Sequence, residues 1–219
     1  MIFEYRCYHI APGQSKALHE HMEHRALPLF ERLGIRPIAF WTPEVGRVWD
    51  RLHYIVPYAD YADRAERWGA WLNHPDRPFG VAEDGTNFLD RVVSEIWEPT
   101  DYSDAPKMGA TAGRTPSWIY EFHRHEIRRD VGGYHEAWRQ ALRLMHKHDI
   151  QPLGFWTTAV GSAPTLNYIV PFESFPARKE KMAAYLSDPE KTYGIASDGK
   201  PFTRNDTIEI WRTTPYSSY

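Results

Sequence analysis

The feature that most constrains this 219-residue chain is an internal repeat, in which the same short motifs recur in the same order. The spacing between matched motifs drifts only from 117 residues near the start to 114 near the end. Conserved order at a near-constant spacing indicates two copies of one structural unit, and the drift is expected to lie in loops. The matched pairs are Ile2–Tyr5 with Ile119–Phe122, Phe40–Thr42 with Phe155–Thr157, Tyr54–Tyr58 with Tyr168–Phe172, and Glu95–Trp97 with Glu209–Trp211.

The repeat divides the chain into a first copy over residues 1–103, a linker over 104–116 and a second copy over 117–219. The linker is small, polar and rich in Gly and Pro. Each copy predicts the order β-α-β-β-α-β, which is the ferredoxin-like order. In the first copy, periodicity and chain breakers predict strands over 2–10, 35–42, 48–57 and 92–97, and helices over 14–33 and 60–72.

An open four-stranded sheet of this kind covers one face with its helices and leaves the other face bare. Two such sheets packed face to face bury both bare faces within one chain. The predicted fold class is therefore α+β, with two ferredoxin-like βαββαβ repeats packed sheet to sheet as a pseudo-dimeric α+β barrel.

Four motifs carry a resemblance to a known family. They are the opening Ile2–Tyr8, the Gly-x-x-x-x-Ala-Phe-Trp segment from Gly34, the following Gly46, and the His-x-x-x-Pro-Tyr segment from His53. Together they resemble the NIPSNAP family, in both copies and more closely in the first. The resemblance implies the dimeric α+β barrel superfamily, whose members include monooxygenases, isomerases, haem enzymes and simple ligand binders.

Composition narrows the classes of partner. The formal net charge is −3 and neither sign forms a long run, so we expect neither a nucleic-acid partner nor a membrane partner. Cys7 is the single cysteine, which gives no reason to expect an oxidising compartment, and a cytoplasmic location is predicted. The expected partners are a small-molecule ligand or substrate and, for the two-repeat chain, a second copy as a homodimer.

Strand alternation places Glu4, Arg6 and Tyr8 on one face of the first strand. Because the other face carries Phe3, Tyr5 and Cys7, the sequence predicts that the polar face points into the barrel and the apolar face packs on helices. The same logic points Glu121, His123 and His125 into the barrel in the second copy. Glu4 and Arg6 are interpreted first as a buried ion pair.

The second copy replaces Arg6 by His123, Tyr8 by His125 and His53 by Asn167. Two groups that titrate near neutrality thus enter the predicted enclosed space, which is typical of a site. The Glu-x-His-x-His spacing of Glu121, His123 and His125 could also bring three ligands to one divalent metal ion, although no cofactor is required by the sequence.

From these residues we expect a protein that binds a small apolar or aromatic organic molecule in its barrel, as an enzyme of the cofactor-light monooxygenase, isomerase or lyase type. The alternatives are a non-catalytic ligand-binding or scaffold protein and a metalloenzyme that uses the Glu-His-His set. Candidate catalytic residues are His123, His125, Arg6, His53 and Glu4, and candidate substrate-binding residues are Trp41, Trp156 and Tyr8.

Overall fold

The computed structural model describes residues 1–46, 50–78, 80–81, 85–103, 117–162, 164–191, 196 and 199–217. The predicted linker 104–116 lies outside the described residues. The first half contains β1 (Ile2–Ile10), α1 (Ser15–His21), a π-helical turn η1 (Met22–Ala26), α2 (Leu27–Arg32), β2 (Phe40–Val45), β3 (Arg51–Tyr58), α3 (Tyr61–Leu72) and β4 (Leu89–Pro99). The second half contains β5 (Ile119–Ile127), α4 (Val131–Lys147), β6 (Gly154–Val160), β7 (Thr165–Phe172), α5 (Phe175–Leu186) and β8 (Thr203–Thr213).

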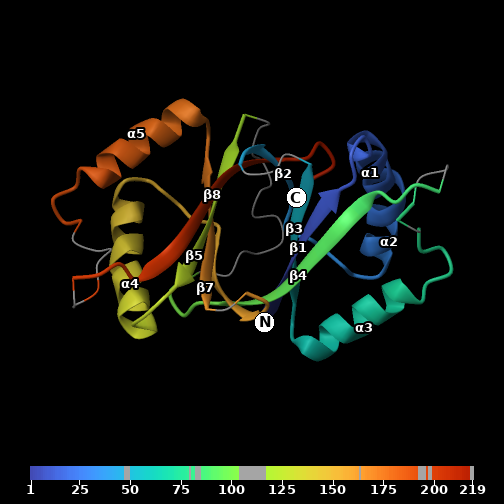
Figure 1. The fold of residues 1–219 in the computed structure, drawn as a ribbon, viewed down its shortest axis with the longest axis horizontal. Helices are drawn as coiled ribbons and strands as arrows, with labels where there is room; N and C mark the ends of the chain where they lie inside the picture. Colours follow the sequence, from blue (N-terminus) through green and yellow to red (C-terminus); the bar gives the residue numbers. More distant parts are fainter. Residues whose placement is uncertain are drawn as a thin grey trace.

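The strands form one closed antiparallel barrel in the order β1-β3-β2-β8-β5-β7-β6-β4. The two halves join edge to edge, because β2 pairs with β8 and β4 pairs with β6. The helices lie outside the barrel, with those of the first half on one side and those of the second half on the other (Figure 1). This confirms the predicted pseudo-dimeric α+β barrel.

The second helix of each half begins where the sequence predicts it. The Asp60 carboxylate accepts hydrogen bonds from the backbone N–H groups of Ala62 and Asp63, both at 2.9 Å. Ser174 occupies the same position in the second half, and its hydroxyl accepts from the N–H of Ala177 at 3.3 Å. Such caps satisfy amide groups that the first helical turn leaves without a partner.

The first helix of each half is where the repeats differ in length. A residue with positive φ lies on each side of this helix. In the first half these residues are Gly13 and Gly34, which are 21 residues apart, and in the second half they are Asp130 and Asp149, which are 19 residues apart. The first half thus holds two more residues, and the π-helical turn η1 interrupts its helix. The prediction that the spacing drift lies only in loops is wrong, because part of it lies in this helix.

The second strand begins later than predicted. β2 starts at Phe40 rather than at residue 35, and Pro37 in the intervening segment has no N–H to donate to a ladder. The segment still joins the sheet at one point, where the Ile38 N–H donates to the Ile55 carbonyl at 2.8 Å.

Three hydrophobic clusters organise the interior. One lies between the first-half sheet and its helices, and a second occupies the equivalent place in the second half. The third draws side chains from both halves and fills the barrel; it contains Phe3, Tyr5, Cys7, Ile38, Ala39, Trp41, Ile55, Trp97, Tyr120, Phe122, Leu153, Trp156, Ile169 and Trp211. Among the described residues, no helix combines the length and apolar character needed to cross a membrane.

Candidate functional site

The two faces of β1 are used in the opposite way from that predicted. Phe3, Tyr5 and Cys7 belong to the cluster that fills the barrel. Glu4 instead lies on the helix side, where it meets Arg64 of α3. The physical reason is that the two halves together exclude water from the barrel interior, so the apolar face of β1 points there. The charged face lies under the helices, which supply partners such as Arg64.

The same correction applies to β5. Glu121 is bonded to Arg178 of α5, and His125 is bonded to Tyr134 of α4, so both side chains lie between the sheet and the helices. His123, which lies between them on the same face, is bonded to Glu121. These residues therefore do not share an enclosed space with Glu4 and Arg6 inside the barrel, and that prediction is wrong.

In the first half, the outward face of β1 carries a closed polar cluster around Glu4. Arg64 donates to both carboxylate oxygens at 2.9 and 3.0 Å, Arg6 donates at 2.9 Å, and Ser94 donates at 2.7 Å. Burial alone would raise the pKa of Glu4, but these hydrogen bonds and the two positive charges outweigh it and lower the pKa. The predicted Glu4–Arg6 ion pair is thus confirmed, at the helix side.

Arg6 and Tyr8 are held equally firmly. The Arg6 guanidinium lies 4.5 Å from the ring centroid of Trp68, which is cation–π distance. The Tyr8 hydroxyl bonds to the Tyr54 hydroxyl at 2.6 Å. This region of the first half is packed and mutually bonded, which fits a structural role for these side chains.

In the second half, a chain of polar side chains follows the same face. Glu121 bonds His123 Nε2 at 2.6 Å and also pairs with Arg178. The His123 ring stacks on Tyr168, with centroids 4.3 Å apart and planes 7° apart. His123 Nδ1 is buried and has no partner among the described residues.

His125 ends this chain. Its Nδ1 lies 2.6 Å from the Tyr134 hydroxyl, and its Nε2 lies 3.5 Å from the Tyr168 hydroxyl, which is a long contact. Burial, helped by His123, lowers the pKa of His125 to about 3, so its imidazole is neutral at physiological pH. Burial also raises the pKa of Tyr134, so this phenol keeps its proton. Tyr134 can therefore donate to Nδ1 while Nε2 carries the ring proton.

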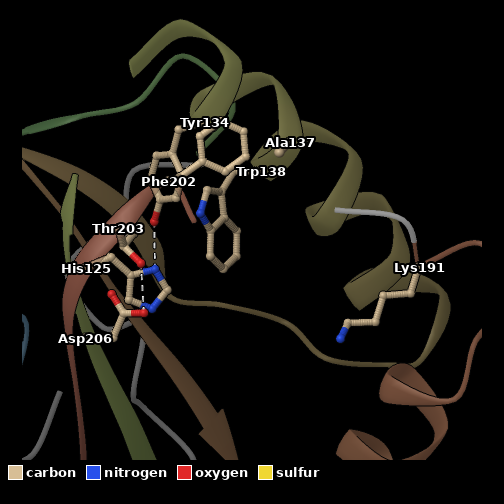
Figure 2. Close-up of a pocket in the computed structure, with 8 residues that line it drawn as sticks. All are labelled: His125, Tyr134, Ala137, Trp138, Lys191, Phe202, Thr203 and Asp206. Atoms are coloured by element: carbon tan, nitrogen blue, oxygen red, sulfur yellow. Dashed lines mark hydrogen bonds between the residues drawn. The ribbon is translucent and has the colours of Figure 1, made fainter. Parts of the chain in front are cut away.

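His125 and Tyr134 lie at one end of a groove between α4 and the outer face of the sheet (Figure 2). The groove, which we call the α4 groove, has a volume of about 240 Å³. Thr203 donates a hydrogen bond to Asp206 at 3.0 Å within it. It is lined by His125, Tyr134, Ala137, Trp138, Lys191, Phe202, Thr203 and Asp206.

The corresponding positions of the first half carry different residues. By the repeat spacing, Tyr8 replaces His125, Leu89 replaces Thr203 and Val92 replaces Asp206. The longer helix there contributes Leu18 and Met22, which are buried in the first-half cluster with Tyr8 and Leu89 packed against it. Among the residues that line the α4 groove, His125, Thr203 and Asp206 therefore stand where the first half carries Tyr8, Leu89 and Val92.

The remaining predicted residues lie elsewhere. Trp41 and Trp156 are fully buried in the barrel, where they pack with other aromatic rings rather than line the α4 groove. His53 is also buried, and its Nδ1 bonds the Tyr5 hydroxyl at 2.9 Å. The groove lies on the outside of the barrel wall, not within the barrel where a ligand was expected.

The predicted metal set is not assembled. Within the described parts of the chain, no three His, Cys, Asp or Glu side chains are arranged to hold a metal ion. The bonds explain this, because His123 turns Nε2 to Glu121 whereas His125 turns Nδ1 to Tyr134. His123 Nε2 and His125 Nδ1 are thus bonded to different side chains and do not converge on one point.

Of the residues that line the groove, only His125 was predicted from the sequence. Tyr134 and Trp138 lie on a helix, where apolar residues at helical spacing indicate packing against the core. The pattern of the last strand indicates only that Asp206 is exposed. The signal that could have found them is the comparison of the two copies outside the first strand, in which Asp206 corresponds to Val92 of the first copy.

An eight-stranded barrel made from two βαββαβ units, with its helices outside and a groove under one of them, defines a dimeric α+β barrel protein. The chain belongs to the NIPSNAP family, whose family model matches it twice, over residues 3–104 and 120–218. No curated protein matches the chain.

Two solved structures share the fold over nearly the whole chain, and a third is similar to part of it. A Fusobacterium nucleatum protein described as a proposed monooxygenase aligns over 97% of this chain and 91% of its own, with 7% identity and a TM-score of 0.64. Chlorite dismutase from Candidatus Nitrospira defluvii aligns over 98% and 91%, with 10% identity and a TM-score of 0.54. A NIPSNAP-like domain protein from Burkholderia xenovorans aligns over 47% of this chain and 88% of its own, with 23% identity and a TM-score of 0.42.

Proposed function

We propose that this NIPSNAP-family protein binds a small aromatic molecule in the α4 groove and acts on it as a cofactor-light enzyme. The observation that carries the proposal is the neutral His125–Tyr134 pair beside the aromatic rings of the groove. The first half supports it, because Tyr8 and Leu89, at the positions of His125 and Thr203, pack against its hydrophobic cluster. Open, polar positions in one copy only are typical of a site.

The size of the groove limits the ligand. A cavity of about 150 Å³ accommodates benzene, so 240 Å³ suits a molecule of about ten heavy atoms. That corresponds to one substituted ring or two small fused rings. Trp138 and Phe202 supply the apolar contacts, and Lys191 lies at the opposite side of the groove from His125 (Figure 2).

The low pKa of His125 makes it a poor proton acceptor and a good neutral hydrogen-bond donor. A neutral imidazole can stabilise negative charge on a substrate oxygen, as in enolate-forming enzymes. Asp206, which is exposed and lines the groove, is the carboxylate placed to accept a proton. In the proposed reaction, a proton leaves a carbon next to a carbonyl group for Asp206 while His125 Nε2–H bonds the carbonyl oxygen.

This step is shared by isomerases, lyases and cofactor-light monooxygenases, and the product depends on what then meets the enolate. The solved structures with a related fold include one described as a proposed monooxygenase and one described as chlorite dismutase. They share the fold alone, so the reaction type rests on the groove residues.

The test is a binding and turnover screen with one-ring and two-ring aromatic ketones and phenols, by calorimetry and mass spectrometry. We expect binding by the native protein, retained binding with lost turnover in Asp206→Asn, and loss of both in Ala137→Met, which fills the groove. Absence of binding by every compound, or turnover unaffected by Asp206→Asn, would overturn the assignment.

A non-catalytic ligand-binding protein is the second candidate, favoured by the weak basicity of His125. Saturable binding that Ala137→Met abolishes, without conversion of any compound, would establish it. A homodimer of the two-repeat chain stays a prediction, which light scattering of the purified protein would decide.

A further inference from the structure

The two halves of the barrel interior treat their buried polar groups differently. In the second half, Asn167 is the centre of a closed network. Its Oδ1 accepts from Arg124 at 2.8 Å, and its Nδ2 donates to Thr158 at 3.0 Å and to Thr165 at 3.2 Å. Arg124 also pairs with Glu95. Every side chain of this network has a partner.

The first half places His53 at the position of Asn167 and Arg51 at the position of Thr165. His53 is 1% exposed, and its Nε2 has no partner among the described residues. Arg51 Nε is also buried without a partner, and Arg51 Nη1 reaches Glu209 only at 3.5 Å. Trp41 Nε1 is a third unpartnered atom.

The strand register places these three groups together. Arg51 and His53 are two residues apart on β3 and therefore share one face. Trp41 of β2 is the cross-strand partner of His53. Trp41 belongs to the cluster that fills the barrel, and the His53 ring stacks on Trp211 of the same cluster, so both lie on the inward side of the sheet. The unpartnered atoms thus lie on three neighbouring inward positions.

All three groups are donors. Guanidinium Nε–H and indole N–H can only donate. Burial raises the pKa of Tyr5, so its hydroxyl keeps its proton and can donate to His53 Nδ1, which leaves the ring proton on Nε2. A buried donor without an acceptor is costly, and three neighbouring ones indicate a missing acceptor.

We propose that Arg51, His53 and Trp41 form a site for a compact singly charged oxyanion, such as a small carboxylate. One water molecule accepts at most two hydrogen bonds, whereas a carboxylate offers about four lone-pair sites to the three donors. Arg51, whose Nη1 also lies 3.5 Å from the buried Glu209 carboxylate, provides the positive charge, and its side chain is 19% exposed, so the site can be reached from solvent. The site lies inside the barrel wall and is independent of the α4 groove.

The test follows indole N–H signals by nuclear magnetic resonance during a titration with sodium formate, against sodium sulfate at matched ionic strength. Trp41 should shift saturably with formate. Trp156, its unpartnered counterpart in the second half, is the internal control and should not shift. Trp41→Phe and Trp156→Phe identify the two signals.

His53→Asn, which introduces the second-half residue, should weaken formate binding at least about tenfold, because a hydrogen bond to a charged group is lost. Trp156→Phe should leave the affinity unchanged. The proposal is overturned if the indole N–H signal of Trp41 does not shift at about 0.1 M formate. At this salt concentration, screening does not prevent an anion from binding through direct contacts. Equal shifts of Trp41 and Trp156, or equal affinity in His53→Asn, would also overturn it.

Discussion

The buried neutral imidazole of His125 makes a quantitative prediction about acid stability. An unfolded chain protonates this residue below its ordinary pKa of 6.5, whereas the folded chain does so only below about 3. The unfolded state therefore binds more protons between these values, and folding stability falls as the pH falls through this window. At about pH 4.5, two units below the unfolded value, the loss is about 2.7 kcal/mol relative to neutral pH.

The perturbation that isolates this effect is His125→Tyr, because tyrosine occupies the equivalent position in the first half as Tyr8. Urea unfolding of the native protein and the variant from about pH 7 to about pH 4.5 gives two stability curves, and their difference should change by about 2.7 kcal/mol. His24→Gln, at an exposed position of η1, controls for the loss of an imidazole as such. Parallel curves for the native protein and His125→Tyr would refute the assignment of a neutral buried His125.

Three other perturbations test separate parts of the structure. Gly161→Ala should lower the free energy of unfolding by about 2–4 kcal/mol, because φ is +133° and the new Cβ would lie 2.7 Å from Glu95 Cγ. The equivalent Gly46→Ala, whose Cβ would approach Glu209 Cγ to 3.2 Å, should lower it by about 1 kcal/mol. Equal losses in urea unfolding would contradict this geometry. Ala137→Met should change stability by less than about 1.5 kcal/mol while abolishing ligand binding by calorimetry, and a ligand still bound with native affinity would place it outside the α4 groove. Burial raises the pKa of the Cys7 thiol to about 11, so a thiol reagent should label urea-unfolded protein rapidly and native protein slowly, and equal rates would show that Cys7 is not buried.

The fold could be predicted because the repeat supplies two independent readings of each element. A weak strand pattern near residue 92 gains support from the same Glu-Ile-Trp motif near residue 209, and both belong to barrel strands, β4 and β8. The way the sheets close could also be predicted, since two half-covered sheets in one chain have few other ways to bury their bare faces. The π-helical turn could not be predicted, because a change in the spacing between motifs does not show whether the extra residues lie in a helix or in a loop.

The direction of the faces could not be predicted from alternation alone. Alternation separates Glu4 from Tyr5 but does not say which of two covered faces receives which set. What decides it is a long-range partner: Arg64 lies sixty residues after Glu4, and Arg178 lies at the corresponding position after Glu121. Both copies carry this Glu and this Arg at matching positions, and the Arg lies on the second helix each time. Pairing the two residues would have predicted that the charged face of the strand lies under the helices.

The α4 groove was missed for a related reason. Its residues come from β5 and α4, which follow one another, and from the segment around the start of β8 more than fifty residues later, together with Lys191. His125 was singled out by its contrast with Tyr8, and the same comparison applied to β8 points to Asp206. A repeat protein therefore carries its own reference, and positions where one copy departs toward small or polar residues are the ones to examine.

The edge-to-edge joining of β2 with β8 and of β4 with β6 has an evolutionary consequence. When such a barrel assembles from two identical subunits, every substitution appears twice, and a change that opens one side also weakens the other. Covalent fusion removes that symmetry constraint. Each half of this chain can therefore change its own polar groups, as Arg51 and His53 in the first half and His125 and Asp206 in the second have done, without the same change appearing in the other half.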